Sequence, residues 1–186
     1  MNNHIYIVSL AVFIAGCATS HKVPEGRPTA KLSLTVQVEA DSTTTRTAYI
    51  LINDEKCANH VNGVDGGASR NLGSPAIITT EPVKVAADIP LYFTTNYIDS
   101  GFAQNRGCSL TGIFTPKIHH NYQARMAVLD NVATCKLGLF DVSTEQEEVV
   151  ELRMPEYICT GEGGPRVKNG QAMQLNWKVK VIPMSR

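Results

Sequence analysis

The feature that most constrains the fold of this chain is an alternation of apolar and polar residues with a period of two. Over residues 32–39 every second residue is leucine or valine, and the residues between them are polar. Successive side chains of a β-strand point to opposite faces, so this pattern predicts a strand with one buried face. The same alternation, or a strand-like composition, recurs in segments 47–53, 76–80, 83–87 with 91–97, 108–115, 122–128, 136–142 and 171–182.

Turn-forming residues separate these segments, as at Asn62-Gly63 and Gly163-Gly164-Pro165. Residues 143–152 fit either a helix or a short strand, and we favour the strand. We expect the glycine-rich residues 62–73 to form a mobile loop and Trp177, in the last amphipathic segment, to anchor the core. Several short strands joined by turns predict an all-β fold, an antiparallel β-sandwich.

The N-terminal residues carry a different pattern. Residues 5–16 are apolar except for Ser9, a run too short to cross the roughly 30 Å core of a bilayer as a helix. The run ends in Ile14-Ala15-Gly16-Cys17. This ending resembles the lipobox of bacterial lipoproteins. The resemblance implies that a signal peptide is removed, that Cys17 is acylated and, because Ala18 follows it, that the protein lies at the outer membrane facing the periplasm.

The chain is therefore expected to have three parts. Residues 1–16 are the lipoprotein signal peptide, residues 17–30 a lipidated flexible tether, and residues 31–186 the β-sandwich domain. Two prolines, a glycine and few apolar residues in the second part predict a flexible segment with a reach of about 40 Å, at roughly 3.3 Å per residue.

Four cysteines follow the acylated one: Cys57, Cys108, Cys135 and Cys159. An even number in an exported chain predicts two disulfides, for which three pairings are open. We prefer Cys108 with Cys135 and Cys57 with Cys159. The four lack the C-x-x-C spacing of a zinc site, so no metal is expected there.

Charge and motif content exclude several functions. Lys plus Arg equals Asp plus Glu at 17 each, so no basic surface for nucleic acid is expected. The sequence has no G-x-S-x-G nucleophile motif and no calcium loop, and adjacent strand residues such as His119 and His120 point apart, so we expect no metal, no cofactor and no enzyme. Exposed rings of Tyr92, Tyr97 and Phe102 are candidates for binding a glycan or small ligand.

A second resemblance covers the middle of the chain. Cys108 to Phe114-Thr-Pro116, then Tyr122-Gln-Ala124, then Cys135 and an apolar strand follow one another. This order is similar to that of small uncharacterised lipoproteins of Gram-negative bacteria. It implies an Ig-like or transthyretin-like sandwich and no particular activity. The chain departs from the pattern at residues 119–121, His-His-Asn, where such proteins tend to carry a glycine.

The function we expect is that of a membrane-anchored lipoprotein in the cell envelope. Lipid on Cys17 would hold it to the membrane, and its domain would serve as a structural module or bind an envelope protein. The alternative is a lipoprotein that binds a glycan or small ligand, and a more remote one is an envelope enzyme built around His119 or His120.

Overall fold

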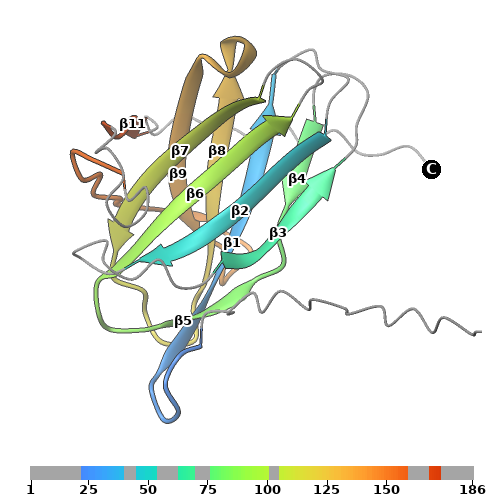
Figure 1. Ribbon diagram of the computed structural model, residues 1–186. Helices are drawn as coiled ribbons and strands as arrows, with labels where there is room; N and C mark the ends of the chain where they lie inside the picture. Colours follow the sequence, from blue (N-terminus) through green and yellow to red (C-terminus); the bar gives the residue numbers. More distant parts are fainter. Residues whose placement is uncertain are drawn as a thin grey trace, which may run out of the picture.

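Two β-sheets packed face to face form the molecule (Figure 1). The structure, a computed structural model, describes residues 22–39, 45–53, 63–69, 76–100, 105–158 and 168–172. One sheet has the order β10-β9-β8-β1-β4, with β5 also pairing with β1 and β11 with β9; the other has the order β3-β2-β6-β7. The strands are β1 (Thr29–Val38), β2 (Thr45–Asn53), β3 (Gly63–Ser69), β4 (Ala76–Thr79), β5 (Val83–Ala86), β6 (Leu91–Ser100), β7 (Asn105–Phe114), β8 (Asn121–Leu129), β9 (Thr134–Asp141), β10 (Glu148–Val150) and β11 (Gln171–Ala172). The predicted fold class, an all-β sandwich with a disulfide, is confirmed.

Strand β1 lies inside the larger sheet, and its alternation has the predicted effect. Its leucines and valines, with Ala30, are at most 2% exposed and face the other sheet. One neighbour is β8, with Leu34 opposite Ala124, and the two strands run parallel. The other edge of β1 pairs with β5 near its start and with β4 near its end, both antiparallel. The sheet is therefore mixed, whereas the local pattern had predicted antiparallel pairing only.

The smaller sheet contains a strand that the sequence did not predict. Residues 63–69 form β3 and pair with β2, so the expectation of a mobile loop over residues 62–73 was wrong for this stretch. Glycine and alanine make up much of β3, and without large side chains it carries no period-two signal. Its conformation comes from hydrogen bonding to β2, where the register shifts between Ala48 and Ile50. A neighbouring strand here overrides weak local preference.

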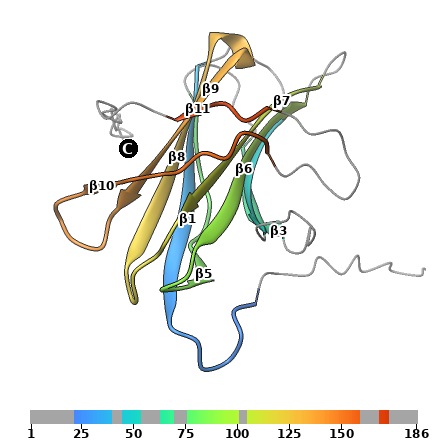
Figure 2. The ribbon, with the colours of Figure 1, turned by 90° about the vertical axis from the view of Figure 1, so that its left-hand side faces the viewer.

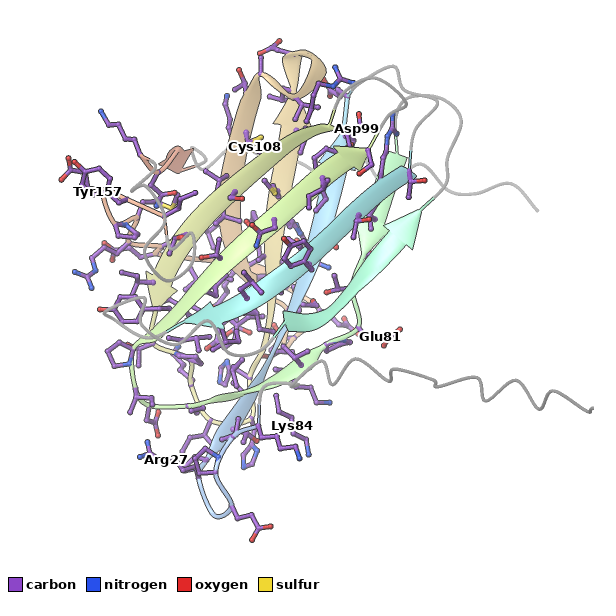
Figure 3. All side chains as sticks on the ribbon, in the orientation of Figure 1. Arg27, Glu81, Lys84, Asp99, Cys108 and Tyr157 are labelled. Carbon is purple, nitrogen blue, oxygen red and sulfur yellow. A yellow bond between two sulfur atoms is a disulfide. The ribbon has the colours of Figure 1, made fainter. Side chains whose placement is uncertain are left out.

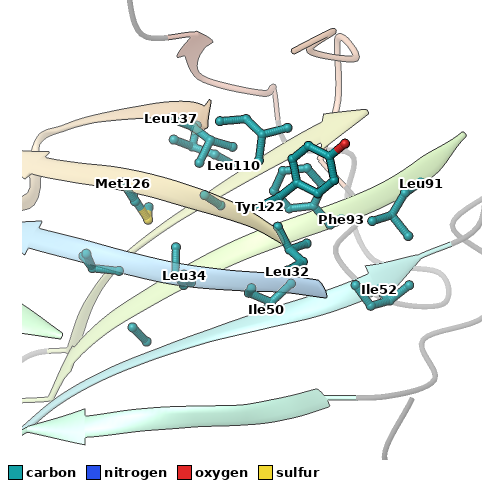
Figure 4. Close-up of a cluster of buried hydrophobic side chains, with 14 of the residues drawn as sticks. Leu32, Leu34, Ile50, Ile52, Leu91, Phe93, Leu110, Tyr122, Met126 and Leu137 are labelled. Carbon is teal, nitrogen blue, oxygen red and sulfur yellow. The ribbon is translucent and has the colours of Figure 1, made fainter. Parts of the chain in front are cut away.

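Apolar side chains from both sheets fill the space between them (Figure 4). Three rings pack edge to face: Phe93 with Phe114 at 5.8 Å between centroids, and Phe114 with Tyr122 at 4.9 Å. Such contacts fix ring positions beyond what burial alone does. Trp177, the expected core anchor, lies outside the described residues, which include only β11 of the predicted last strand.

A segment after β10 closes the side of the sandwich between β7 and β9. We call residues 151–158 and 168–170 the side strap. Arg153 forms a backbone bridge with Ile113 of β7, and the side chain of Asn169 bonds the backbone N–H and C=O of Thr111 at 3.1 and 2.7 Å. On the same side, the predicted disulfide between Cys108 of β7 and Cys135 of β9 joins the two sheets. Cys57 and Cys159 lie outside the described residues.

Candidate functional site

Three loops meet at the end of the sandwich where the chain enters β1 (Figures 1 and 2). They are residues 22–28 before β1, residues 87–90 between β5 and β6, and residues 115–120 between β7 and β8. Together with the adjoining ends of β1 and β5 we call them the tether end. Within the predicted tether, the described residues contain a turn with an N–H to C=O bond from Arg27 to Pro24. The strand then begins at Thr29, close to the predicted boundary.

Backbone hydrogen bonds hold these loops to one another. The N–H of Ala87 donates to the carbonyl of Pro28 at 2.9 Å, and the N–H of Asp88 donates to the carbonyl of Pro116 at 2.8 Å. The N–H of His119 donates to the carbonyl of Thr29 at 2.9 Å. Each bond joins two different segments of the chain, so the tether end is a connected surface with a defined shape.

Two loop residues adopt a backbone conformation that costs energy. Asp88 has φ of 58° and His119 has φ of 62°, in the left-handed region that glycine favours. His119 belongs to residues 119–121, where the sequence pattern predicted a glycine, and glycine adopts this backbone conformation without strain. The hydrogen bonds to Pro116 and Thr29 hold these two residues in place despite the strain.

The tether end also exposes large apolar side chains. Ile89 and Ile118 are each 40% exposed, and Pro90 beside Ile89 is exposed too. Single exposed apolar residues are common on protein surfaces. Here they lie on two loops that are bonded to each other through Asp88 and Pro116.

A polar cluster links this end to the loop after β9. The Nδ1 atom of His120 lies 2.5 Å from Oδ2 of Asp141, while the hydroxyl and the backbone N–H of Ser143 both donate to Oδ1 of Asp141. The N–H of Asn121 donates to the Ser143 hydroxyl at 2.8 Å. Partial burial raises the pKa of Asp141, but the hydrogen bonds from Ser143 and His120 outweigh it, and the pKa lies below its ordinary value.

This cluster has the residue types of a hydrolase triad but a different order. In a triad the imidazole stands between serine and carboxylate, so that it takes the serine proton. Here the carboxylate of Asp141 stands in the middle and receives the Ser143 hydroxyl directly. The arrangement joins two loops, and the hydroxyl is bonded to a carboxylate rather than to an imidazole. Among the described residues no three His, Cys, Asp or Glu side chains form a group able to hold a metal ion.

The edge strand β10 presents a second exposed surface (Figure 2). Val149 is 51% exposed, more than any other large apolar residue whose exposure is described. Nearby, Arg125 of β8 lies over the ring of Phe140 at 4.3 Å and binds both carboxylate oxygens of Glu147, at 2.9 and 2.5 Å. The hydrogen bond from Arg125 is the main reason that the pKa of Glu147 is lowered. These contacts fix the loop that leads into β10.

The three aromatic candidates do not form one surface. Tyr97 is 0% exposed and faces the core, Tyr92 is half-buried on the opposite face of β6, and Phe102 lies outside the described residues. Cys17 lies outside them as well. Within the described parts of the chain no helix is long and apolar enough to cross a membrane.

Buried charges at the far end of the sandwich were not foreseen from the sequence. Asp99 lies near this end of β6 (Figure 3). Arg46 is 0% exposed and lies opposite Asp99 in the β2–β6 register, and Arg106 binds Asp99 at 3.1 Å. Burial, followed by the charge of Asp99, raises the pKa of the adjacent Tyr97 to about 12. Arg46 and Asp99 occupy inward positions on strand faces that are otherwise mainly apolar, and this break in the alternation is the sequence signal that could have identified them.

Comparison with known proteins adds no family to these observations. No protein-family model matches the sequence, and no curated protein matches it either.

Proposed function

We propose that this chain is a lipoprotein of the bacterial cell envelope, anchored by lipid on Cys17, whose sandwich binds a partner protein. We place it at the outer membrane, facing the periplasm. The observation that carries the anchor is Cys17 itself, which directly follows a short apolar run and two small residues. Acyl chains contribute about 0.8 kcal/mol per buried methylene, and more than one chain makes attachment stable.

Cell fractionation of a Cys17→Ser variant tests the anchor. The wild-type chain is expected in the membrane fraction and to incorporate labelled palmitate. The Cys17→Ser variant should incorporate none and should move to the soluble fraction or remain unprocessed. A Thr19→Ser variant, changed next to the same site, is the matched control. A wild-type chain that is soluble and free of lipid would contradict the proposed lipid anchor.

The β10 edge supports the second half, partner binding. Among the described strands β10 pairs only with β9, so its other edge offers backbone groups to a strand of another protein. Val149 adds an exposed apolar contact on that edge, and the Arg125–Glu147 pair holds the preceding loop in place. A polar cluster with no activated nucleophile favours binding over catalysis.

Site-specific crosslinking in cells tests this surface. A photoreactive amino acid replaces Val149, and in a matched strain it replaces Ile77, a residue 42% exposed on β4 at the other side of the same sheet. We expect one discrete envelope protein to be crosslinked at residue 149 and not at residue 77. The same protein should escape capture when Val149→Lys is pulled down without crosslinker. Equal capture at both positions, or none with an efficient crosslinker, would contradict docking at β10.

A further inference from the structure

We propose that the tether end is a membrane-contact surface that rests on an anionic phospholipid bilayer and so fixes the direction in which the sandwich stands. This inference depends on the lipid anchor proposed above, but it concerns a different part of the molecule. It rests on three observations: the short distance that the chain allows between Cys17 and the folded domain, the charges of the tether end, and its two exposed isoleucines.

The chain leaves little room between the lipid and the folded domain. Only residues 18–21 separate Cys17 from Lys22, where the described structure begins. A fully extended chain spans at most about 3.6 Å per residue, so Lys22 lies within about 18 Å of the acylated cysteine. The loop turn formed by residues 24–27 protrudes at this same end of the molecule (Figures 1 and 2). An acylated Cys17 would therefore bring the tether end, and no other end, to the lipid headgroups.

Several basic side chains lie at the tether end, the part of the domain that would face the lipid headgroups. Lys31 of β1 and Lys84 of β5 are direct partners in the sheet, and both are exposed. Figure 3 shows Lys84 and Arg27 at this end of the molecule. Like charges opposite each other destabilise a sheet unless an anion lies between them. Lys22, Arg27 and Lys117 extend the charge onto the loops, and among the described residues none of the five cations forms an ion pair.

The acidic side chains in the same region are fewer. On its loops and strand ends they are Glu25 and Asp88, with Glu81 on the linker before β5. Glu145 and Glu148 lie outside the tether end as defined above, on the adjoining segment after β9, where Glu147 pairs with Arg125. His120 and Asp141 already pair with each other. The tether end thus carries a positive excess, although the whole chain has equal numbers of basic and acidic residues, 17 of each. Lysine and arginine near a bilayer surface are attracted by anionic headgroups, so this excess complements phosphatidylglycerol.

The exposed isoleucines give the surface a contact of a second kind. Ile89 and Ile118 lie on loops joined by the Asp88–Pro116 hydrogen bond, so they can meet one plane together. Apolar side chains flanked by cations are typical of segments that lie at the boundary between headgroups and acyl chains. Lipid alone would leave the domain free to rotate about its tether. Added contacts from these loops would select one orientation.

Lysine footprinting of the full lipoprotein in vesicles tests the proposal. The purified chain is placed in vesicles of phosphatidylcholine alone or with phosphatidylglycerol, treated with a water-soluble amine reagent, and analysed by mass spectrometry. We expect labelling of Lys31, Lys84 and Lys117 to fall about five-fold on the anionic vesicles. Lys136 is the internal control, because it is exposed near the start of β9, away from the tether end. It should be labelled equally on both kinds of vesicle.

Variants separate the surface from the anchor. Ile89→Ser with Ile118→Ser, or Lys31→Gln with Lys84→Gln, should restore labelling of Lys117, whereas Ile77→Ser, matched in exposure and distant from this end, should not. All these variants should still float with the vesicles, because flotation reports the lipid on Cys17. If the chain proves to carry no lipid, vesicles added to the soluble protein allow the same comparison. Protection of Lys136 equal to that of the other lysines, or no protection on anionic vesicles, would overturn the proposal.

Discussion

At the scale of single residues, the polar groups inside this sandwich differ in how well they are satisfied. Asp141 receives hydrogen bonds from Ser143 and His120. The hydroxyl of Tyr97, buried among core side chains, has no hydrogen-bond partner in the part of the chain that the structure describes. A buried polar group stabilises a fold only when its bonds are made, so these two residues should respond to substitution in opposite ways.

Replacing Asp141 by asparagine should destabilise the protein. We expect Asp141→Asn to lower the free energy of unfolding by about 1–3 kcal/mol at neutral pH, because the bonds to the carboxylate weaken. The folded pKa of Asp141 is depressed below its ordinary value of 3.8, so its contribution is present above that pH and is lost as pH falls through the folded pKa. Urea unfolding at pH 7 and pH 3 measures this. Glu145→Gln, on the exposed loop nearby, is the control, and a loss that persists undiminished in acid would be the contrary result.

Replacing Tyr97 by phenylalanine should leave stability unchanged or raise it by about 1 kcal/mol at pH 7, since the removed hydroxyl has no partner among the described residues. The folded pKa of Tyr97 is raised from 10.0 to about 12. The wild-type chain therefore loses stability as the pH rises from 10 toward 12, because Tyr97 ionises more readily in the unfolded state than in the folded one. The advantage of Tyr97→Phe should grow over that range in chemical unfolding curves. A marked loss at pH 7 would mean that the hydroxyl is bonded in solution.

Features that depend on neighbouring residues could be read from the sequence, whereas contacts between residues far apart along the chain could not. The apolar faces of β1 and β8 could be predicted, whereas the observed Cys108–Cys135 pairing was a preference among three pairings that the sequence left open. The pairing of His120 with Asp141 could not, because the two lie on different strands with no local pattern connecting them. The same holds for Arg46 and Asp99, which become neighbours only through the β2–β6 register.

At the scale of elements, how well a strand could be predicted from the sequence depended on the size of its side chains. Strands with large alternating residues were found at nearly the predicted bounds, and β3, made mainly of small residues, was missed. The side strap was missed for another reason. Residues 151–158 include two isolated bridge positions rather than a strand, and they are held by contacts to β7 and to residues 168–170. Such contacts depend on tertiary structure and produce no periodic pattern in the sequence.

The side strap gives a prediction at this scale. A Cβ atom on Gly112 would lie 2.6 Å from Cδ1 of Leu152, which packs against the core. We therefore expect Gly112→Ala to cost about 1–3 kcal/mol of stability by displacing the strap. In a Leu152→Ala background the same change should cost much less, because the space is then free. A double-mutant cycle measures the coupling, and equal costs in both backgrounds would show that the two residues are independent.

At the scale of the whole molecule, a disulfide links the two sheets within the part of the chain that the structure describes. The Cys108–Cys135 disulfide links β7 to β9 across 27 positions of sequence. By the chain-entropy estimate a loop of this size contributes about 3–4 kcal/mol. We expect Cys108→Ala with Cys135→Ala to lower the free energy of unfolding by that amount, measured in denaturant. A doubly substituted chain as stable as the wild type would show that the two sheets need no covalent link.

The placement of β1 bears on when this protein can fold. The first strand of the sandwich pairs on one edge with β8, and the bond from Ser33 to the carbonyl of Tyr122 spans 89 positions. Contacts so far apart form slowly and require most of the chain to be present. For the exported lipoprotein proposed above, this connectivity would keep the chain unfolded while its N-terminal part enters a translocation channel. The same topology that completes the larger sheet would thereby keep the polypeptide competent for export until synthesis is nearly finished.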